Sequence, residues 1–301
     1  DWEPQIIYVH HQTAPFPTRI WLPPFAEPIA PRVPALMSRE VNTIGMTIAQ
    51  ALESNGMPGA THMGTGFDAW YPGYIDYLPM FKNIAAFWTE TQGSGAAPRT
   101  SAPDQIPSAM RRPQSLYSSP WLGGTWKFRD AVDYMHTASL SVLEYASRYR
   151  DSLLYNRYQA GRDQILKGRR EAPYAYVIPQ DQRDPVAAVE LLRRLAFSGV
   201  RVGQLTSALT IENTSYPAGT WIIPTDQEFA ALAREVLDVQ KYPEIRESPT
   251  GPLDQPYDAA GWTLPLAMGV KVAAVSTQLG KEPVKWLGPS VDVKAKPVPY
   301  I

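Results

Sequence analysis

Two short apolar runs with a helical pattern between them organise the N-terminal part of the chain. Gln5 to Val9 is a β-branched and aromatic run that ends at two histidines, which predicts a buried strand. The proline-studded stretch from Pro15 to Pro34 predicts an irregular loop. From Met37 to Asn55 apolar residues recur at three- and four-residue steps, so we expect a helix that ends at Gly56.

A loop, a second strand and a linker are predicted after this helix. The segment Met63 to Pro79 is rich in glycine and aromatic residues, as loops often are. Asn83 to Thr91 predicts a second buried strand, and its one carboxylate is Glu90. Residues 93–126 are rich in Pro, Ser, Gly and Ala, a composition that buries little surface, so we expect a linker there.

A long helical pattern occupies residues 127–168. From Lys127 to Lys167 the chain has no proline and a single glycine, Gly161. Its apolar residues again fall at three- and four-residue steps. This pattern predicts one long amphipathic helix or two joined helices.

Residues 169–301 alternate between strand and helix patterns. Tyr174 to Pro179 and Val200 to Leu205 predict two strands. The helix between them is expected to begin with Asp184 as N-cap and Pro185 in its first turn. Strand, helix and strand joined by short turns predict a βαβ unit, and hence a parallel sheet with a right-handed crossover.

Three further patterns lie downstream of this unit. Leu209 to Ile211 and Gly219 to Ile223, separated by a polar turn, predict a hairpin. Thr225 to Glu228 has the Thr-x-x-Glu spacing of a capping box and predicts the start of another helix. The proline-rich tail from Pro243 is expected to wrap over the surface.

Composition narrows the classes of protein that these elements could form. The chain has 301 residues, with 28 Lys and Arg against 29 Asp and Glu, so its net charge of −1 gives no reason to expect a nucleic-acid partner. The absence of cysteine from the sequence excludes disulfides, thiolate metal sites and a cysteine nucleophile. No apolar run approaches the roughly 20 residues that a membrane-spanning helix needs. The chain starts at Asp1 without an initiator methionine. We therefore expect either that it was processed or that it is part of a longer precursor.

The first strand and the second strand each carry a residue that could do chemistry. Alternation along the first strand places Val9 and His11 on one face and Tyr8 and His10 on the other, so only one histidine can point into a given site. The pair could equally be a core residue and a surface residue. Glu90 stands in apolar surroundings, where carboxyl groups can act as general bases, or it could be an ordinary salt-bridged residue.

Six short stretches carry a resemblance to a known family: Ile6–Pro17, Gly66–Trp70, Asn83–Thr91, Tyr176–Pro179, Tyr216–Gly219 and Gly261–Leu266. They resemble the zinc carboxypeptidases, the carboxypeptidase A-like metallopeptidases, and in particular the bacterial exported type with a C-terminal amidotransferase-like domain. The resemblance implies that residues 1–92 are the C-terminal part of a carboxypeptidase-type mixed sheet. It also implies that residues 169–301 form a small Rossmann-like parallel-sheet domain with a proline-rich tail, so the whole chain is α/β.

The resemblance assigns roles to individual residues. It implies that His11 is the third zinc ligand, with His10 as the second candidate, and that Glu90 is the general base. Phe67 and Asp68 fall where the family lines its side-chain pocket. A catalytic zinc held in this way activates water while the glutamate takes its proton. The resemblance further implies a peptide substrate and a periplasmic or extracellular location.

One departure from the family pattern limits these expectations. The family takes its first two zinc ligands from an upstream His-x-x-Glu, and this sequence contains no such pair. We therefore expect zinc only together with upstream ligands, and no peptidase activity from this chain alone. A partial sheet also exposes an edge, so we expect a protein partner or a missing N-terminal half. The alternative is a non-catalytic structural or binding subunit of a larger assembly.

Overall fold

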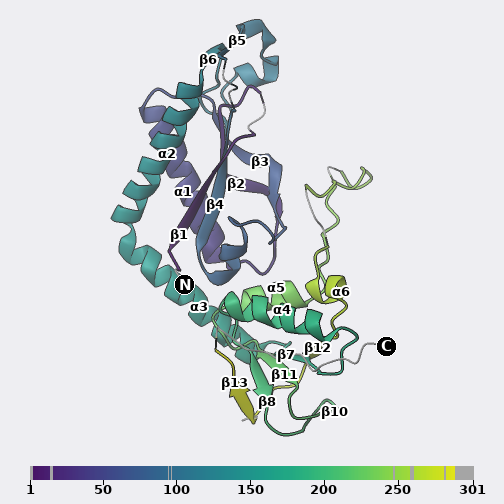
Figure 1. Cartoon of the computed structure of the whole chain (residues 1–301). Coiled ribbons are helices and arrows are strands. Elements are labelled where there is room, and N and C mark those ends of the chain that lie inside the picture. The colour runs from purple at the N-terminus through teal and green to yellow at the C-terminus, as the bar shows by residue number, and fades with distance from the viewer. Residues whose placement is uncertain are drawn as a thin grey trace. The chain divides into compact units, whose positions relative to one another are not determined.

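The computed structural model describes residues 3–13, 16–93, 95, 97–246, 248–257, 261–280 and 283–288, and Figure 1 shows its elements. The chain forms two compact units. Unit 1 comprises Asp1–Met80, Ile84–Arg157 and Gln255–Tyr257, and unit 2 comprises Phe81–Asn83, Tyr158–Asp254 and Asp258–Ile301.

A four-stranded mixed sheet forms the centre of unit 1. Its strands are β1 (Ile6–His11), β2 (Ile20–Ile29), β3 (Ala60–Ala69) and β4 (Ala85–Thr91). They lie in the order β1-β4-β2-β3 (Figure 1). β1 is parallel to β4 and β2 is parallel to β3, whereas β2 and β4 are antiparallel. The α/β class and the mixed character of this sheet are confirmed.

The helix α1 (Ala35–Ser54) supplies the other half of the core of unit 1. Its apolar stripe is buried, with Ile44, Ile48 and Leu52 fully inaccessible to solvent, which confirms the helix predicted from this spacing. Gly45 allows close approach to β2, because a Cβ at this position would overlap the carbonyl group of Pro23. The helix therefore fixes the position of the strand in front of it.

We expected an irregular loop between Pro15 and Pro34, but the strand β2 forms within this segment, so the prediction was wrong. Pro15 itself lies outside the described residues. The prolines after Trp21 cannot donate backbone hydrogen bonds, which normally keeps proline out of central strands. β2 avoids the conflict because it pairs with β4 only at Ile20 and Trp21. Its pairing with β3 shifts register after Leu22, where the prolines begin.

Two other segments of unit 1 are more ordered than their composition suggested. The glycine-rich segment from Met63 was expected to be a loop, but its first part belongs to β3. The linker contains β5 (Arg99–Ser101), β6 (Gly124–Trp126) and two short 3-10 helices, Pro103–Gln105 and Ser108–Arg111.

Aromatic residues explain why the expectation of a non-packing linker was wrong. Trp121 and Trp126 are buried, and the guanidinium group of Arg19 lies 3.9 Å and 4.8 Å from their ring centroids. Arg19 itself is only 2% exposed, and burial lowers its pKa to about 10. These cation–π contacts attach the segment to the start of β2.

The long helical pattern of residues 127–168 forms two helices, which was one of the two predicted alternatives. These are α2 (Phe128–Arg148) and α3 (Arg150–Arg170), with Tyr149 between them. The buried side of α2 includes Tyr134, Ala138 and Val142. α2 packs against α1.

Unit 2 contains a five-stranded sheet in the order β12-β7-β11-β8-β13. Every neighbouring pair in it is antiparallel, so the predicted parallel, Rossmann-like sheet is wrong. β7 and β8 do run in the same direction around α4, but β11 lies between them and pairs with both. The bounds are β7 (Ala175–Ile178), α4 (Pro185–Phe197), β8 (Gly203–Leu205), β11 (Trp221–Pro224), β12 (Ala273–Val275) and β13 (Val284–Trp286).

The remaining elements of unit 2 differ in detail from the predicted ones. The first predicted strand of the hairpin is confirmed as β9 (Leu209–Ile211), but its partner is β10 (Thr214–Tyr216), which lies within the segment expected to be the turn. The capping box is absent, because Thr225 donates its hydroxyl to Pro173 O and α5 (Ala230–Leu237) begins later.

The tail was expected to wrap over the surface, yet its described part contributes α6 (Leu264–Met268), β12 and β13. Residues 289–301 of the tail lie outside the described residues. Among the helices of the described part of the chain, none has the length and apolar character to cross a membrane.

The predicted N-cap of α4 can be tested by mutation. Asp184 accepts hydrogen bonds from the backbone N–H groups of Val186 and Ala187, at 2.9 Å and 3.0 Å. We expect Asp184→Ala to lower the free energy of unfolding by about 1 kcal/mol, because two helix-end donors lose their acceptor. Urea unfolding followed by circular dichroism measures the change. Asp181→Ala is the control, since the side chain of Asp181 is 96% exposed, and an equal loss in both variants would contradict the cap.

Candidate functional site

The pairing of β1 with β4 places His11 beside Glu90. The two strands are parallel, and His11 is the direct partner of Glu90 at their carboxyl ends. Val9 pairs with Trp88 two residues earlier, so all four residues share one face of the sheet. The sheet thus brings together the two residues that the sequence selected as ligand and base.

The carboxylate of Glu90 is held by three donors. His11 Nδ1 lies 3.0 Å from Oε2, and the hydroxyl of Thr13 also donates to Oε2. The indole N–H of Trp88 donates to Oε1 at 3.2 Å. Because an ionised carboxylate only accepts hydrogen bonds, the proton of the His11 ring lies on Nδ1 in this arrangement. The site is therefore a buried carboxylate with a fixed orientation.

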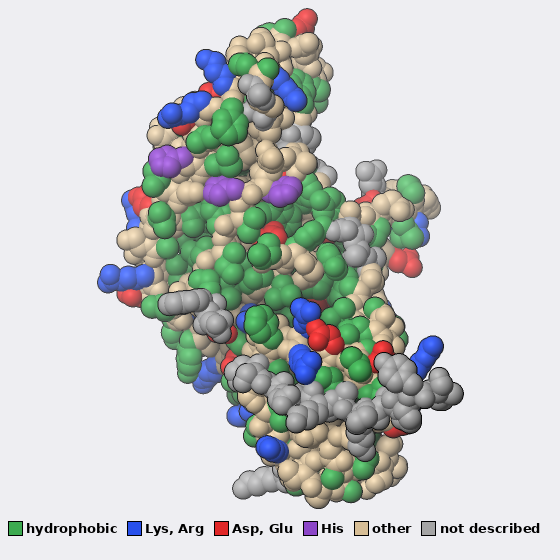
Figure 2. Space-filling view, viewed as in Figure 1, with side chains coloured by type: hydrophobic (Ala, Val, Ile, Leu, Met, Phe, Trp, Pro, Cys, Tyr) green, Lys and Arg blue, Asp and Glu red, His purple; other side chains and the backbone are tan. Residues whose placement is uncertain are grey.

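Solvent reaches the pair from the histidine side. The side chain of His11 is 62% exposed, whereas that of Glu90 is 4% exposed. In Figure 2 histidine side chains lie on the visible face of unit 1, beside a broad hydrophobic area. A molecule arriving from solvent would meet the imidazole first and the carboxylate behind it.

A pocket of about 200 Å³ opens beside the pair, wholly within unit 1. Its wall is largely aromatic and aliphatic, so it can hold an apolar group next to the carboxylate. The lining residues are Val9, His11, Tyr74, Ile75, Asp76, Trp88, Glu90 and Tyr257.

Asp76 adds a second buried carboxyl group to this pocket. The pKa of Asp76 is raised to about 6, mainly by burial and to a small extent by the charge of Glu90, while a backbone hydrogen bond and His11 act in the opposite direction. Tyr257 also has a raised pKa, mainly from burial and then from the negative charges of Glu90, Asp68 and Asp76. The pocket thus contains an acid that exchanges its proton near neutral pH.

His10 faces away from this pocket. Its Nε2 lies 2.9 Å from the hydroxyl of Ser139 on α2, and its ring lies 4.2 Å from that of Tyr8. Burial lowers the pKa of His10. The alternation expected from the sequence is therefore confirmed, and of the two histidines only His11 meets Glu90.

Phe67 and Asp68 lie behind the pocket wall instead of in it. The ring of Phe67 makes edge contacts with Tyr257 and Trp88, with centroids 4.6 Å and 6.2 Å apart. Asp68 accepts hydrogen bonds from the backbone N–H groups of Trp70 and Tyr257. Both residues hold lining residues in place, and neither lines the pocket itself.

Two lining residues, Asp76 and Tyr257, were not predicted from the sequence. Asp76 is an acid within an aromatic-rich segment, and that combination could have been noticed. Tyr257 reaches the pocket from the C-terminal tail, 189 residues after its partner Asp68. A contact of such separation leaves no periodic pattern.

The pocket offers one candidate metal ligand with a carboxylate beside it. The ligand is the exposed imidazole of His11, and the carboxylate is that of the buried Glu90. However, no group of three or more His, Asp or Glu side chains in the described part of the chain is arranged to hold a metal ion. These residues could form part of a zinc site, and further ligands would have to complete it.

Comparison with known proteins adds no relative to this picture. No family model, no curated protein and no solved structure matches the chain.

Proposed function

We propose that unit 1 carries part of a hydrolytic centre of the zinc carboxypeptidase type, with peptides as substrates. The observation that supports it is the pairing of His11 with the buried Glu90 at the carboxyl ends of two parallel strands, next to a mostly apolar pocket. In this proposal His11 is one metal ligand and Glu90 is the base. The remaining ligands come from a segment other than the described residues.

The chain's own residues suit the task of a base. Thr13 and Trp88 hold the two carboxylate oxygens of Glu90 in place, so the group can accept a proton from water without reorienting. Tyr74 and Tyr257 form part of the pocket wall next to this carboxylate. A zinc ion, when bound, would lower the pKa of the attacking water.

The edge of the sheet suggests where the missing ligands would enter. Among the described strands, β1 pairs only with β4, so its other edge is open. A groove of about 540 Å³ follows this edge, and its walls include Leu143, Leu153 and Leu154. In this proposal an extended segment that brings the missing ligands adds to β1 and covers the groove.

Measuring bound zinc tests whether the metal ligands are divided between this chain and an upstream segment. We expect the chain alone to retain little zinc after dialysis. A protein with an upstream segment containing His-x-x-Glu should bind one equivalent of zinc. It should also release C-terminal residues from peptides. In that longer protein, His11→Ala should remove the zinc. Glu90→Gln should keep the zinc and lower kcat by about 100-fold or more, because only the base is lost.

The controls for this experiment come from the same chain. His136→Ala should change neither zinc content nor activity, because His136 lies on α2 and does not line the pocket. One equivalent of zinc bound at His11 by the chain alone would contradict the divided site. An inert longer protein that binds zinc would leave the non-catalytic binding subunit as the better assignment.

The groove along β1 has a separate test. Leu143 and Leu154 are 65% and 56% exposed, so the chain alone should self-associate through this apolar face. We expect the double substitution of both leucines by Glu to shift sedimentation towards the monomer. Val186→Glu is the matched control, because Val186 is 65% exposed on α4 in unit 2. A monodisperse monomer from the unmodified chain would contradict the open interface.

A further inference from the structure

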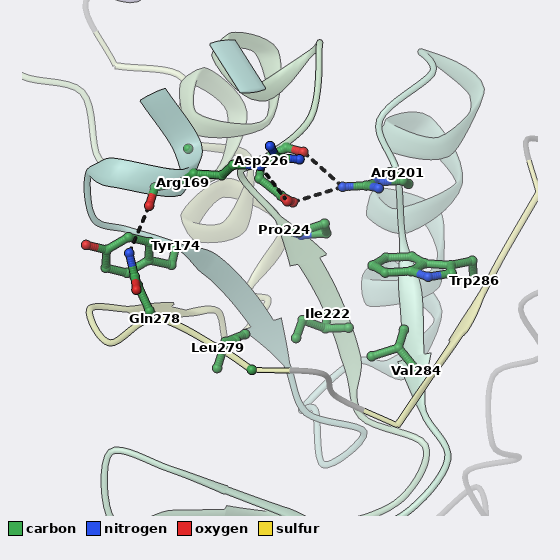
Figure 3. A pocket seen from close by; sticks show the side chains of 12 residues that line it. Arg169, Tyr174, Arg201, Ile222, Pro224, Asp226, Gln278, Leu279, Val284 and Trp286 are labelled. Atoms are coloured by element: carbon green, nitrogen blue, oxygen red, sulfur yellow. Dashed lines mark hydrogen bonds and ion pairs between the residues drawn. The ribbon is translucent and has the colours of Figure 1, made fainter. Parts of the chain in front are cut away.

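A pocket of about 470 Å³, larger than the pocket beside Glu90, lies wholly within unit 2. Such a volume is within the range of small-molecule sites. Figure 3 shows charged groups gathered at one end of this pocket and apolar side chains at the other. Its lining includes Arg169, Arg201, Ile222, Asp226, Val284 and Trp286.

The charged end contains two guanidinium groups and one carboxylate. Arg201 Nη2 donates to Asp226 Oδ1 at 2.9 Å and to the backbone oxygen of Asp226 at 3.0 Å. Arg169 Nε lies 3.7 Å from the other carboxylate oxygen. Among the described lining residues, Arg169, Arg201 and Asp226 carry +1, +1 and −1, which leaves an excess of +1 at this end. An anion of unit charge would balance it.

The ion pairs at this end can exchange partners. The side chains of Arg169, Arg201 and Asp226 are 62%, 45% and 39% exposed. Exposed ion pairs contribute little to stability, so a ligand carboxylate could compete with Asp226 for the guanidinium groups. Nε and Nη1 of Arg201 make no hydrogen bond to the described residues, and these donors remain for a ligand.

Trp286 forms a flat wall next to Arg201. The guanidinium carbon of Arg201 lies 4.9 Å from the centroid of the indole ring. The ring can approach β8 closely because Gly203 has no side chain: a Cβ there would overlap Val284 and Trp286. The indole is nevertheless half exposed. This face is therefore held in place and still accessible.

The opposite wall is fixed by backbone contacts. The last turn of α3 packs directly on the turn after β11, where a Cβ on Gly168 would overlap the carbonyl group of Thr225. Gln278 donates its side-chain amide to Arg169 O at 2.9 Å. Arg169 and Asp226 thus stand on two backbone segments in direct contact.

We propose that this pocket binds a small monocarboxylate with an apolar body. The carboxylate would bind between Arg201 and Arg169, since a guanidinium group offers paired donors to a carboxylate. The apolar body would lie against Ile222, Val284 and the face of Trp286. A dianion such as phosphate would exceed the positive charge of the pocket. The site is independent of His11 and Glu90.

Calorimetric titration of the full chain tests the proposal. The probes are N-acetyl-phenylalanine, its C-terminal amide, and a pentapeptide ending in phenylalanine with a free or an amidated C-terminus. We expect the free acids to bind and the amides to bind about tenfold more weakly or worse, because they lack the charge. If the acylated amino acid and the peptide acid bind equally, the ligand is a chain terminus. If only N-acetyl-phenylalanine binds, the ligand is a small metabolite.

Variants assign the binding to the pocket. Arg201→Gln should weaken binding of the acid about tenfold, whereas Arg194→Gln, on the exposed face of α4, should not change it. Asp226→Asn should tighten binding, because it removes the competing carboxylate, and a purely structural role for Asp226 would give the opposite sign. Fluorine NMR of 5-fluorotryptophan-labelled chain should show a shift of the Trp286 signal, identified by its loss in Trp286→Phe.

Four outcomes would overturn the proposal. These are equal affinity for acid and amide, no binding at millimolar concentration, equal effects of Arg201→Gln and Arg194→Gln, and binding that is lost in His11→Ala. Thermal unfolding of each variant confirms folding, and Arg169→Gln replaces Arg201→Gln if the latter does not fold. Because the titration needs no zinc, its result is separate from that for the hydrolytic centre.

Discussion

The parallel pairing of β1 with β4 is the constraint on which the site in unit 1 depends. The register places His11 opposite Glu90 at the carboxyl ends of both strands. A shift of one residue would turn His11 to the other face of the sheet, where His10 now contacts Ser139. All seven residues of β4 are buried, so both of its faces are packed, and a one-residue shift of this strand would exchange the side chains buried on each face. The core therefore specifies the site.

Local patterns in the sequence predicted the parts of this arrangement that depend on local chemistry. The period of α1, the N-cap of α4 and the alternation along β1 each follow from residues a few positions apart. The same alternation places His11 and His10 on opposite faces of the strand. Glu90 is the only carboxylate in the predicted strand Asn83–Thr91, and the structure confirms that it is buried.

Long-range pairing accounts for what the sequence did not predict. β2 carries prolines that normally exclude a central strand, and only its short pairing with β4 makes them acceptable. β11 enters between β7 and β8 from later in the chain, so two strands around one helix gave no sign that a third would separate them. Tyr257 joins its pocket from a different part of the chain altogether.

The insertion of β11 also explains why unit 2 has a pocket where a parallel sheet was expected. Ile222 and Pro224 lie on β11 or at its end, and Asp226 follows two residues later, so this strand supplies both the apolar and the acidic part of the lining. β13 then brings Trp286 to the other side, which Gly203 allows on β8. Had β7 and β8 been direct neighbours, Arg201, two residues before β8, would have no Asp226 beside it. The antiparallel order thus creates the paired charges as well as the cavity.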